Sequence, residues 1–136
     1  MKRRDLEGPI QRSIIAYLRQ VIPNCIAHHS ANEGVRGGSA GYFDGAKRKG
    51  MGQVAGFPDI ILILPAHIGT AYFEVKAPGG KVSEAQAECH YRLGALGYRV
   101  GVVQSIDEVR DYLAEWGIWT EDRSPRKSKA PEKPRP

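Results

Sequence analysis

The sequence predicts an α/β domain, built as a mixed β-sheet with helices on both of its faces. Three observations favour this class. The elements follow the order helix, strand, hairpin, helix, strand, helix. The strand–helix–strand unit over residues 70–77, 83–96 and 99–104 favours a right-handed parallel crossover. The run at 60–64 is apolar at every position, which is typical of a strand in the interior of a sheet.

The first half of the chain contains a helix, a short strand and a long connection. The helix is predicted from Pro9, which suits a first helical turn, and it ends before Pro23. Its apolar residues recur at helical spacing: Ile10, Ile14, Tyr17, Leu18 and Val21. Residues 25–30 predict a strand with Ile26 as its apolar anchor. The segment 31–57 holds eight of the chain's 16 glycines, and such a long connection is usually functional or mobile.

Two capping-box patterns mark the remaining helices. Ser83 with Gln86 opens one helix, and Ser105 with Glu108 opens the last. The strand at 99–104 lies between them. The apolar stripes of the two helices are Ala85, Cys89, Leu93 and Leu96 in the first, and Ile106, Val109, Leu113 and Trp116 in the second.

Length and composition indicate one globular domain. The chain has 136 residues, 41% hydrophobic and 26% charged, so we expect a domain over 1–120 and a disordered basic, proline-rich tail over 121–136. The net charge of +5 is compatible with nucleic-acid binding but does not establish it.

Membrane, secretory and disulfide-rich classes are not indicated. No apolar run approaches the roughly 20 residues needed to span a bilayer, and the basic start of the chain lacks a signal-peptide core. Cys25 and Cys89 are too few and too scattered for a disulfide framework or a zinc site. We therefore expect an intracellular protein with no membrane partner.

The hairpin places three charged side chains on one face of the sheet. In a symmetric hairpin centred on the turn at 66–69, Asp59 lies opposite Lys76 and Ile61 lies opposite Glu74. Side chains alternate along a strand, so the two acids and the lysine share a face.

This arrangement suits metal-assisted phosphodiester hydrolysis. A divalent cation polarises the phosphoryl oxygen and lowers the pKa of bound water. Magnesium prefers oxygen ligands and keeps several waters, so Asp59 and Glu74 are sufficient, with the Val75 carbonyl as a candidate third ligand. Lys76, protonated beside Glu74, could orient the attacking water or offset negative charge in the transition state.

The same residues also allow an interpretation without chemistry. A glutamate and a lysine two residues apart on a strand often form a weak ion pair on a solvated face. An aspartate after proline is often a turn residue. The interior apolar run that begins with an acid aimed at the same patch favours the chemical interpretation.

The histidines and Cys89 give no separate metal site. His28 and His29 are adjacent on a strand, so they point to opposite faces and cannot chelate one ion together. His29 could face the acidic patch, and a polar strand role is the alternative. Cys89 lies on the apolar stripe of its helix and is expected to be a buried, inert thiol.

The ordered set Gly56-Phe57-Pro58-Asp59, Glu74-Val75-Lys76 and Ser83-x-x-Gln86 resembles the PD-(D/E)XK nuclease superfamily. Within it, the pattern is similar to the virus-type replication–repair nuclease (VRR-NUC) family. The similarity includes 31–34, 51–52 and 97–100. It implies a restriction-endonuclease-like core and DNA cleavage dependent on Mg²⁺, with Mn²⁺ able to substitute. It places the metal at Asp59 and Glu74 and makes Lys76 catalytic.

The resemblance implies two further site residues. Glu7 matches an acid on the family's first helix, although Gly8 and Pro9 follow directly and leave open whether Glu7 lies on the helix. A carboxylate favoured by the helix dipole is the alternative. Gln86 matches the family's helix glutamine near the active site. Its capping-box role explains it without catalysis, and both roles can hold together.

DNA is the expected partner. The candidate phosphate contacts lie in the glycine-rich segment and are Arg36, Lys47, Arg48 and Lys49. The resemblance implies a phage or prophage nuclease in the bacterial cytoplasm, acting as a homodimer on branched DNA such as Holliday junctions. A non-catalytic DNA-binding module of the same fold and a sequence-specific restriction-type endonuclease are the alternatives.

Overall fold

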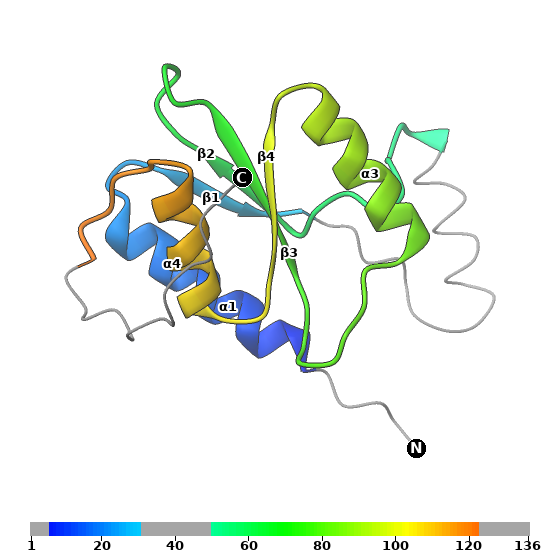
Figure 1. Cartoon of the computed structure of the whole chain (residues 1–136), viewed down its shortest axis with the longest axis horizontal. Coiled ribbons are helices and arrows are strands. Elements are labelled where there is room, and N and C mark those ends of the chain that lie inside the picture. Colours follow the sequence, from blue (N-terminus) through cyan, green and yellow to red (C-terminus); the bar gives the residue numbers. More distant parts are fainter. Residues whose placement is uncertain (1–5, 31–49, 123–136) are drawn as a thin grey trace, which may run out of the picture.

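The computed structural model describes residues 6–30 and 50–122, which form a mixed four-stranded sheet flanked by helices (Figure 1). The elements are α1 (Glu7–Val21), β1 (Ile26–His29), β2 (Ile60–Ile63), β3 (Thr70–Val75), α3 (Glu84–Ala95), β4 (Arg99–Val103) and α4 (Ile106–Glu115). The strand order is β1-β2-β3-β4, with β1, β2 and β3 antiparallel and β4 parallel to β3. The predicted α/β class and the parallel crossover are confirmed.

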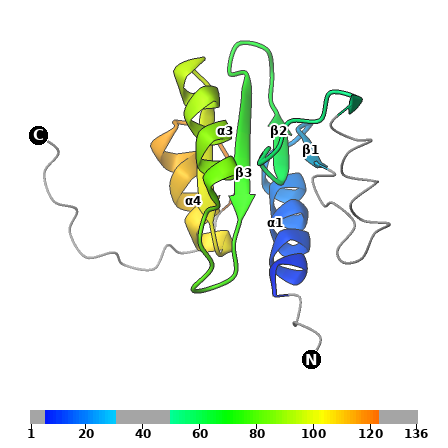
Figure 2. The same cartoon turned by 90° about the vertical axis from the view of Figure 1, so that its right-hand side faces the viewer.

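The sheet has two unlike faces. The ring of Phe73 contacts Tyr112 and Trp116 of α4, and α4 also contacts α1, so these two helices cover one face. His90 of α3 reaches Glu74, the next residue on β3, so α3 covers the other face. We call these the core face and the α3 face. Helices α3 and α4 lie on opposite sides of β4 (Figure 1), and α3 stands in front in the view turned by 90° (Figure 2).

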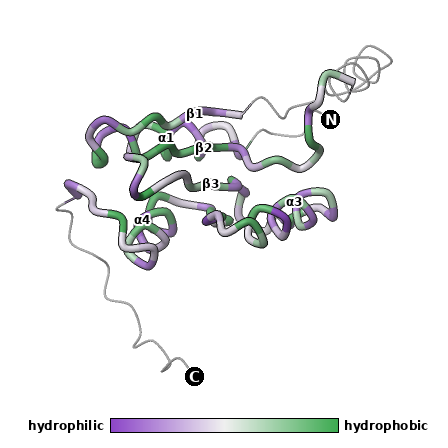
Figure 3. Tube along the Cα trace, turned by 90° about the horizontal axis from the view of Figure 1, so that it is seen from above, coloured by the Kyte–Doolittle hydropathy of each residue, from purple (hydrophilic) through white to green (hydrophobic). Residues whose placement is uncertain are grey.

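The hydrophobic core lies on the core face. Strand β2 is hydrophobic along its length (Figure 3), and Ile60 and Leu62 are fully buried. The inner positions predicted for the first and last helices are confirmed: Ile14, Tyr17, Leu18 and Val21 are buried in α1, and Val109 and Leu113 are buried in α4.

The α3 face is covered only in part, and two predictions fail there for that reason. Ile26 is 59% exposed while Ala27 is 2% exposed, because Ala27 faces α1 and Ile26 faces away from it. The predicted apolar stripe of α3 is also wrong. Cys89 is the buried residue of that helix, and Leu96 is 74% exposed. Helix α3 packs beside β4 and leaves the β1–β2 part of its face open.

Both predicted helix caps form, but the second differs in detail. The Ser105 side chain accepts a hydrogen bond from the Glu108 backbone N–H at 3.2 Å. The Glu108 carboxylate accepts from Gln104 N–H at 2.7 Å, one residue before the position that a full capping box requires. In the described part of the chain no helix has the length and hydrophobicity to cross a bilayer.

Several predictions fall outside the described residues. They concern the DNA contacts Arg36, Lys47, Arg48 and Lys49, residues 31–49 of the glycine-rich segment, and residues 123–136 of the tail. The first two tail residues contact the domain. Glu121 N–H donates to the Val21 carbonyl at 2.7 Å, and Asp122 accepts from the Tyr17 hydroxyl at 2.6 Å.

Candidate active site

The hairpin brings the two predicted metal-binding acids together, in a register that differs from the prediction. Ile61 pairs with Tyr72 rather than with Glu74. Continuing this register by two residues sets Asp59 beside Glu74 and not opposite Lys76. The prediction placed the centre of the turn too far along the chain. Because the register differs by two residues, every side chain keeps its predicted face. The two acids are therefore closer neighbours than the sequence indicated.

Asp59 is held in place by both its side chain and its backbone. Its Oδ2 accepts a hydrogen bond from Val75 N–H at 2.7 Å, and its backbone carbonyl accepts from Ser30 N–H at 2.7 Å. The preceding loop lies directly against α3. A Cβ at Gly56, which has a φ of +75°, would meet the Ala85 carbonyl carbon at 2.3 Å. Glycine is therefore required here for the loop to position Asp59 beside α3.

Glu74 is a buried acid next to another acid. Its side chain is 1% exposed. Burial raises its pKa to about 9, with further increases from the hydrogen bond and charge of Asp59, while the charge of Lys76 lowers it. Lys76 is itself buried, at 8% exposure, and its N–H donates to the Val103 carbonyl at 2.9 Å. At neutral pH this pair of acids therefore requires a proton or a cation.

His90 is a site residue that the sequence prediction missed. Its Nε2 lies 3.2 Å from Oε1 of Glu74. Burial lowers the pKa of His90, as does the nearby Lys76 charge, so the ring is a neutral hydrogen-bond partner. Helical spacing could have identified it, because His90 follows Gln86 by four residues and so lies on the same side of α3. The prediction weighed Cys89 and His90 together and gave a role only to Cys89, as a buried thiol, and Cys89 is indeed buried and free.

The structure places Glu7 and Gln86 near this end of the sheet. Glu7 is the first residue of α1, which settles the question of whether it lies on the helix. Its charge contributes to raising the pKa of Glu74. Gln86 forms the predicted capping box: its Oε1 accepts from Ser83 N–H at 2.9 Å, and its own N–H donates to Ser83 Oγ at 3.2 Å. A catalytic role for either residue stays a prediction.

The histidines of β1 do not join the acids. His29 pairs with Ile60, whose side chain lies on the core face, so His29 lies on the α1 side of the sheet. Its Nδ1 contacts Nε2 of Gln11 and lies 3.3 Å from the Asp59 carbonyl oxygen. His28 is exposed.

The donor set fits a hard divalent cation. Among residues 6–30 and 50–122, no group of three or more His, Cys, Asp or Glu side chains is arranged to hold a metal. Magnesium does not need such a group, because it binds one or two carboxylates and keeps several waters. Asp59 and Glu74 supply two carboxylates, and the Val75 carbonyl supplies a further oxygen. The pKa of Glu74 is raised first by burial and then by the hydrogen bond and charge of Asp59, so a bound cation would favour the ionised carboxylate.

Comparisons with known proteins agree with the fold and then establish the family. A solved structure described as a VRR_NUC domain protein matches with a TM-score of 0.62 and 24% identity, covering 85% of this chain and 90% of that one. Another, described as a VRR_NUC domain, matches with a TM-score of 0.57 and 23% identity, covering 82% and 97%. Both matches support the α/β fold of this chain.

The chain belongs to the VRR-NUC domain family. The profile of that domain matches residues 22–107, well over half of the chain. A search of curated proteins gave no significant match. Membership means that this is a nuclease-type domain, which implies binding to DNA. The family assigned from the sequence motifs is thereby confirmed.

Proposed function

We propose that this protein is a Mg²⁺-dependent endonuclease that hydrolyses DNA phosphodiester bonds. The observation that carries the proposal is the convergence of Asp59, Glu74 and Lys76 at one end of the sheet, with Glu74 and Lys76 both buried. Burying Glu74 beside the half-buried Asp59 is unfavourable for folding, so this pair in a nuclease-type domain supports a chemical role.

Each residue has a role that follows from its position. Asp59 and Glu74 would hold the cation, with the Val75 carbonyl as third ligand. The bound cation would polarise the phosphoryl oxygen and generate a nucleophile from water. Lys76 provides positive charge beside Glu74 that can offset the charge developing on the phosphate. His90 fixes the orientation of the Glu74 carboxylate through its hydrogen bond.

The substrate and assembly are proposed as branched DNA and a homodimer. A two-fold dimer presents two equivalent sites, which would cut a four-way junction symmetrically. Mn²⁺ would substitute for Mg²⁺. We retain as proposed DNA contacts the four basic residues of the glycine-rich segment: Arg36, Lys47, Arg48 and Lys49.

The test compares labelled four-way junction, flap and linear duplex DNA, with and without Mg²⁺, alongside sizing of the protein in solution. Asp59→Asn and Lys76→Ala should each lower the cleavage rate by about 100-fold or more. Glu88→Gln on α3 and Lys81→Ala, which change exposed residues, are the matched controls and should cleave at the wild-type rate. Full activity of the Asp59 or Lys76 variant would refute the proposed mechanism.

The alternative functions give different outcomes in the same assay. A non-catalytic DNA-binding module would bind every substrate and cut none of them in Mg²⁺ or Mn²⁺. A sequence-specific endonuclease would leave the junction intact and give discrete fragments from long linear DNA. Cleavage of the junction in preference to the linear duplex of the same sequence supports structure-directed action.

A further inference from the structure

A groove follows the outer side of α1 where this helix passes the edge strand β1. Its volume is about 480 Å³. The residues that shape it are Gly8, Gln11, Arg12, Ile15, Arg19 and His29, with the small side chain of Ala16 completing the lining. We call it the α1 groove.

The α1 groove is positively charged. Arg12 and Arg19 are seven residues apart, so they share a helix face and stand about 10 Å apart along the axis. No acidic side chain is among the lining residues. Within the described ranges, neither arginine forms an ion pair with a carboxylate. A guanidinium nitrogen of Arg19 donates to the Ala27 carbonyl at 3.0 Å, which fixes this charge beside β1.

One end of the α1 groove adjoins the candidate active site. His29, in its lining, lies 3.3 Å from the carbonyl oxygen of Asp59. Gly8, also in the lining, directly follows Glu7, whose charge acts on Glu74. The groove lies on the α1 side of the sheet and the acid pair on the α3 face, so a polymer lying along α1 would come near the pair where the helix begins at Glu7.

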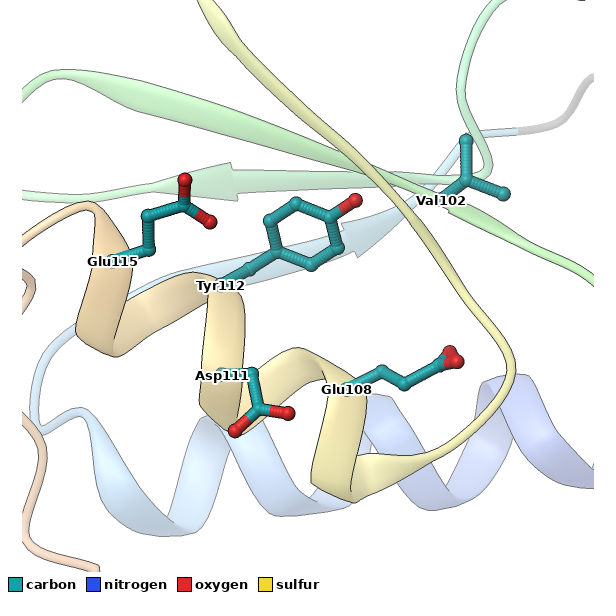
Figure 4. Close-up of a pocket in the computed structure, with 5 residues that line it drawn as sticks. All are labelled: Val102, Glu108, Asp111, Tyr112 and Glu115. Atoms are coloured by element: carbon teal, nitrogen blue, oxygen red, sulfur yellow. The ribbon is translucent and has the colours of Figure 1, made fainter. Parts of the chain in front are cut away.

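A second hollow elsewhere on the surface has the opposite charge. It lies at α4 and β4, has a volume of about 260 Å³, and is lined by Glu108, Asp111 and Glu115 together with Val102 and Tyr112 (Figure 4). Three carboxylates repel a polyanion, whereas two arginines attract one. The charges therefore favour one orientation for DNA on this domain, along α1 and away from α4.

We infer that the α1 groove holds the sugar–phosphate backbone of the DNA duplex next to the scissile phosphate, with Arg12 and Arg19 each contacting a phosphate. Successive phosphates of one strand rise by about 3.4 Å along the duplex axis and are further apart along the backbone, so arginines about 10 Å apart can reach two different phosphates of one strand. This inference rests on the proposed function and deepens it, because it assigns a substrate-binding surface on the described part of the chain.

The experiment measures DNA binding separately from cleavage. Binding of labelled linear duplex and four-way junction is followed by fluorescence anisotropy, with a chelator present, between about 50 and 200 mM salt. Arg12→Gln should reduce the slope of log affinity against log salt by about 0.9 and weaken binding about three- to tenfold. Arg92→Gln, which removes one exposed charge from α3, should leave the slope unchanged.

A second pair of variants adds charge instead of removing it. Ala16→Glu places a carboxylate in the α1 groove and should weaken binding by about tenfold or more. Ala114→Glu makes the same change at an exposed position of α4 and should weaken it far less. Circular dichroism and thermal unfolding verify that each variant is folded.

The outcomes separate this inference from the proposed function. Equal affinities and salt slopes for the groove variants and their controls would overturn the inference, even if the wild type cleaves DNA. No DNA binding by the wild type would also overturn it. Groove-dependent binding without any metal-dependent cleavage would refute the nuclease and leave only the DNA-binding role of the α1 groove.

Discussion

Phe73 and Glu74 are neighbours on β3, both are buried, and they serve opposite purposes. Phe73 points to the core face, where aromatic rings of α4 surround it. Glu74 points to the α3 face, where it meets Asp59 and His90. Alternation along one strand thus separates the hydrophobic core from the candidate active site by a single residue. The same strand contributes a buried aromatic ring to the core on one side and buries an acid with a strongly raised pKa on the other.

The helices that cover the two faces differ in the same way. Helices α1 and α4 contribute six buried residues to the core face: Ile14, Tyr17, Leu18, Val21, Val109 and Leu113. Helix α3 contributes one buried residue, Cys89. Its remaining contacts include the hydrogen bond from His90 to Glu74. In the described part of the chain, α3 therefore depends less on hydrophobic burial than α1 and α4 do, and its contact with the sheet includes the hydrogen bond to Glu74.

The largest expected effect is the loss of stability caused by a substitution on the core face. Phe73→Ala should lower the free energy of unfolding by about 3–5 kcal/mol, because the ring is fully buried and its loss leaves a cavity. Tyr72→Ala, at the neighbouring position on the α3 face, should lower it by about 1–2 kcal/mol, since that ring is only half-buried. Urea unfolding of both variants measures the difference. Equal losses would show that the α3 face is as tightly packed as the core face.

The next effect concerns a substitution of Glu74, which we expect to lower activity and to raise stability. Glu74→Gln should abolish cleavage while raising the stability of the metal-free protein by about 1–2 kcal/mol at pH 7, since the amide needs no proton or cation. Thermal unfolding with a chelator measures the gain. Glu88→Gln, at an exposed position of α3, should change neither property.

The pH dependence of this gain gives a second test of Glu74. Its pKa is about 9 in the folded protein and has an ordinary value of 4.5, so the folded state binds the proton more tightly. The stability that Glu74 contributes is fully present below pH 4.5 and is lost as the pH rises through about 9. The advantage of Glu74→Gln should therefore grow across this range. An advantage independent of pH would contradict the raised pKa.

A smaller effect is expected from the residue that positions Glu74. His90→Ala should weaken Mn²⁺ binding, measured by calorimetry, by about tenfold, as is typical when a partner of a metal ligand is removed. His90→Gln should recover part of the affinity, because its amide can donate to the same carboxylate. Tyr91→Ala, which alters a side chain that is 75% exposed, is the control. Unchanged metal affinity in His90→Ala would show that the contact is only structural.

The sequence was sufficient to predict the helices and strands and the face of the sheet on which the site residues lie, because both follow from local periodicity. Period-2 alternation placed Asp59, Glu74 and Lys76 on one face, and this result tolerated a wrong register, since a shift of two residues preserves the face. The register itself depends on where the turn closes. Leu64 N–H donates to the Gly69 carbonyl at 3.0 Å, and no local pattern distinguished this closure from one centred further along the chain.

Tertiary arrangement explains the predictions that failed. Ile26 and Leu96 have the spacing of buried residues, yet both are exposed, because periodicity cannot show how far α3 extends across the sheet. His90 was missed for a related reason. His90 becomes a partner of Glu74 only when α3 is placed over β3, and the sequence does not show that placement. The adjacent Cys89 fitted the apolar stripe of the helix and so drew the prediction instead. Predictions for groups of residues on one strand were therefore more reliable than those for contacts between distant elements.

The smallest expected effect separates the two roles of Gln86. Ser83→Ala removes the hydroxyl that accepts from Gln86 N–H and should lower stability by about 1 kcal/mol with little change in cleavage. Gln86→Glu keeps an acceptor for Ser83 N–H, so the capping box survives, but it removes the amide donors. We expect Gln86→Glu to retain stability and to cleave about tenfold more slowly, because the cap uses the amide oxygen and not the amide donors that this variant lacks. Wild-type cleavage by Gln86→Glu would assign Gln86 to the cap alone, and α3 would then reach the reaction only through His90.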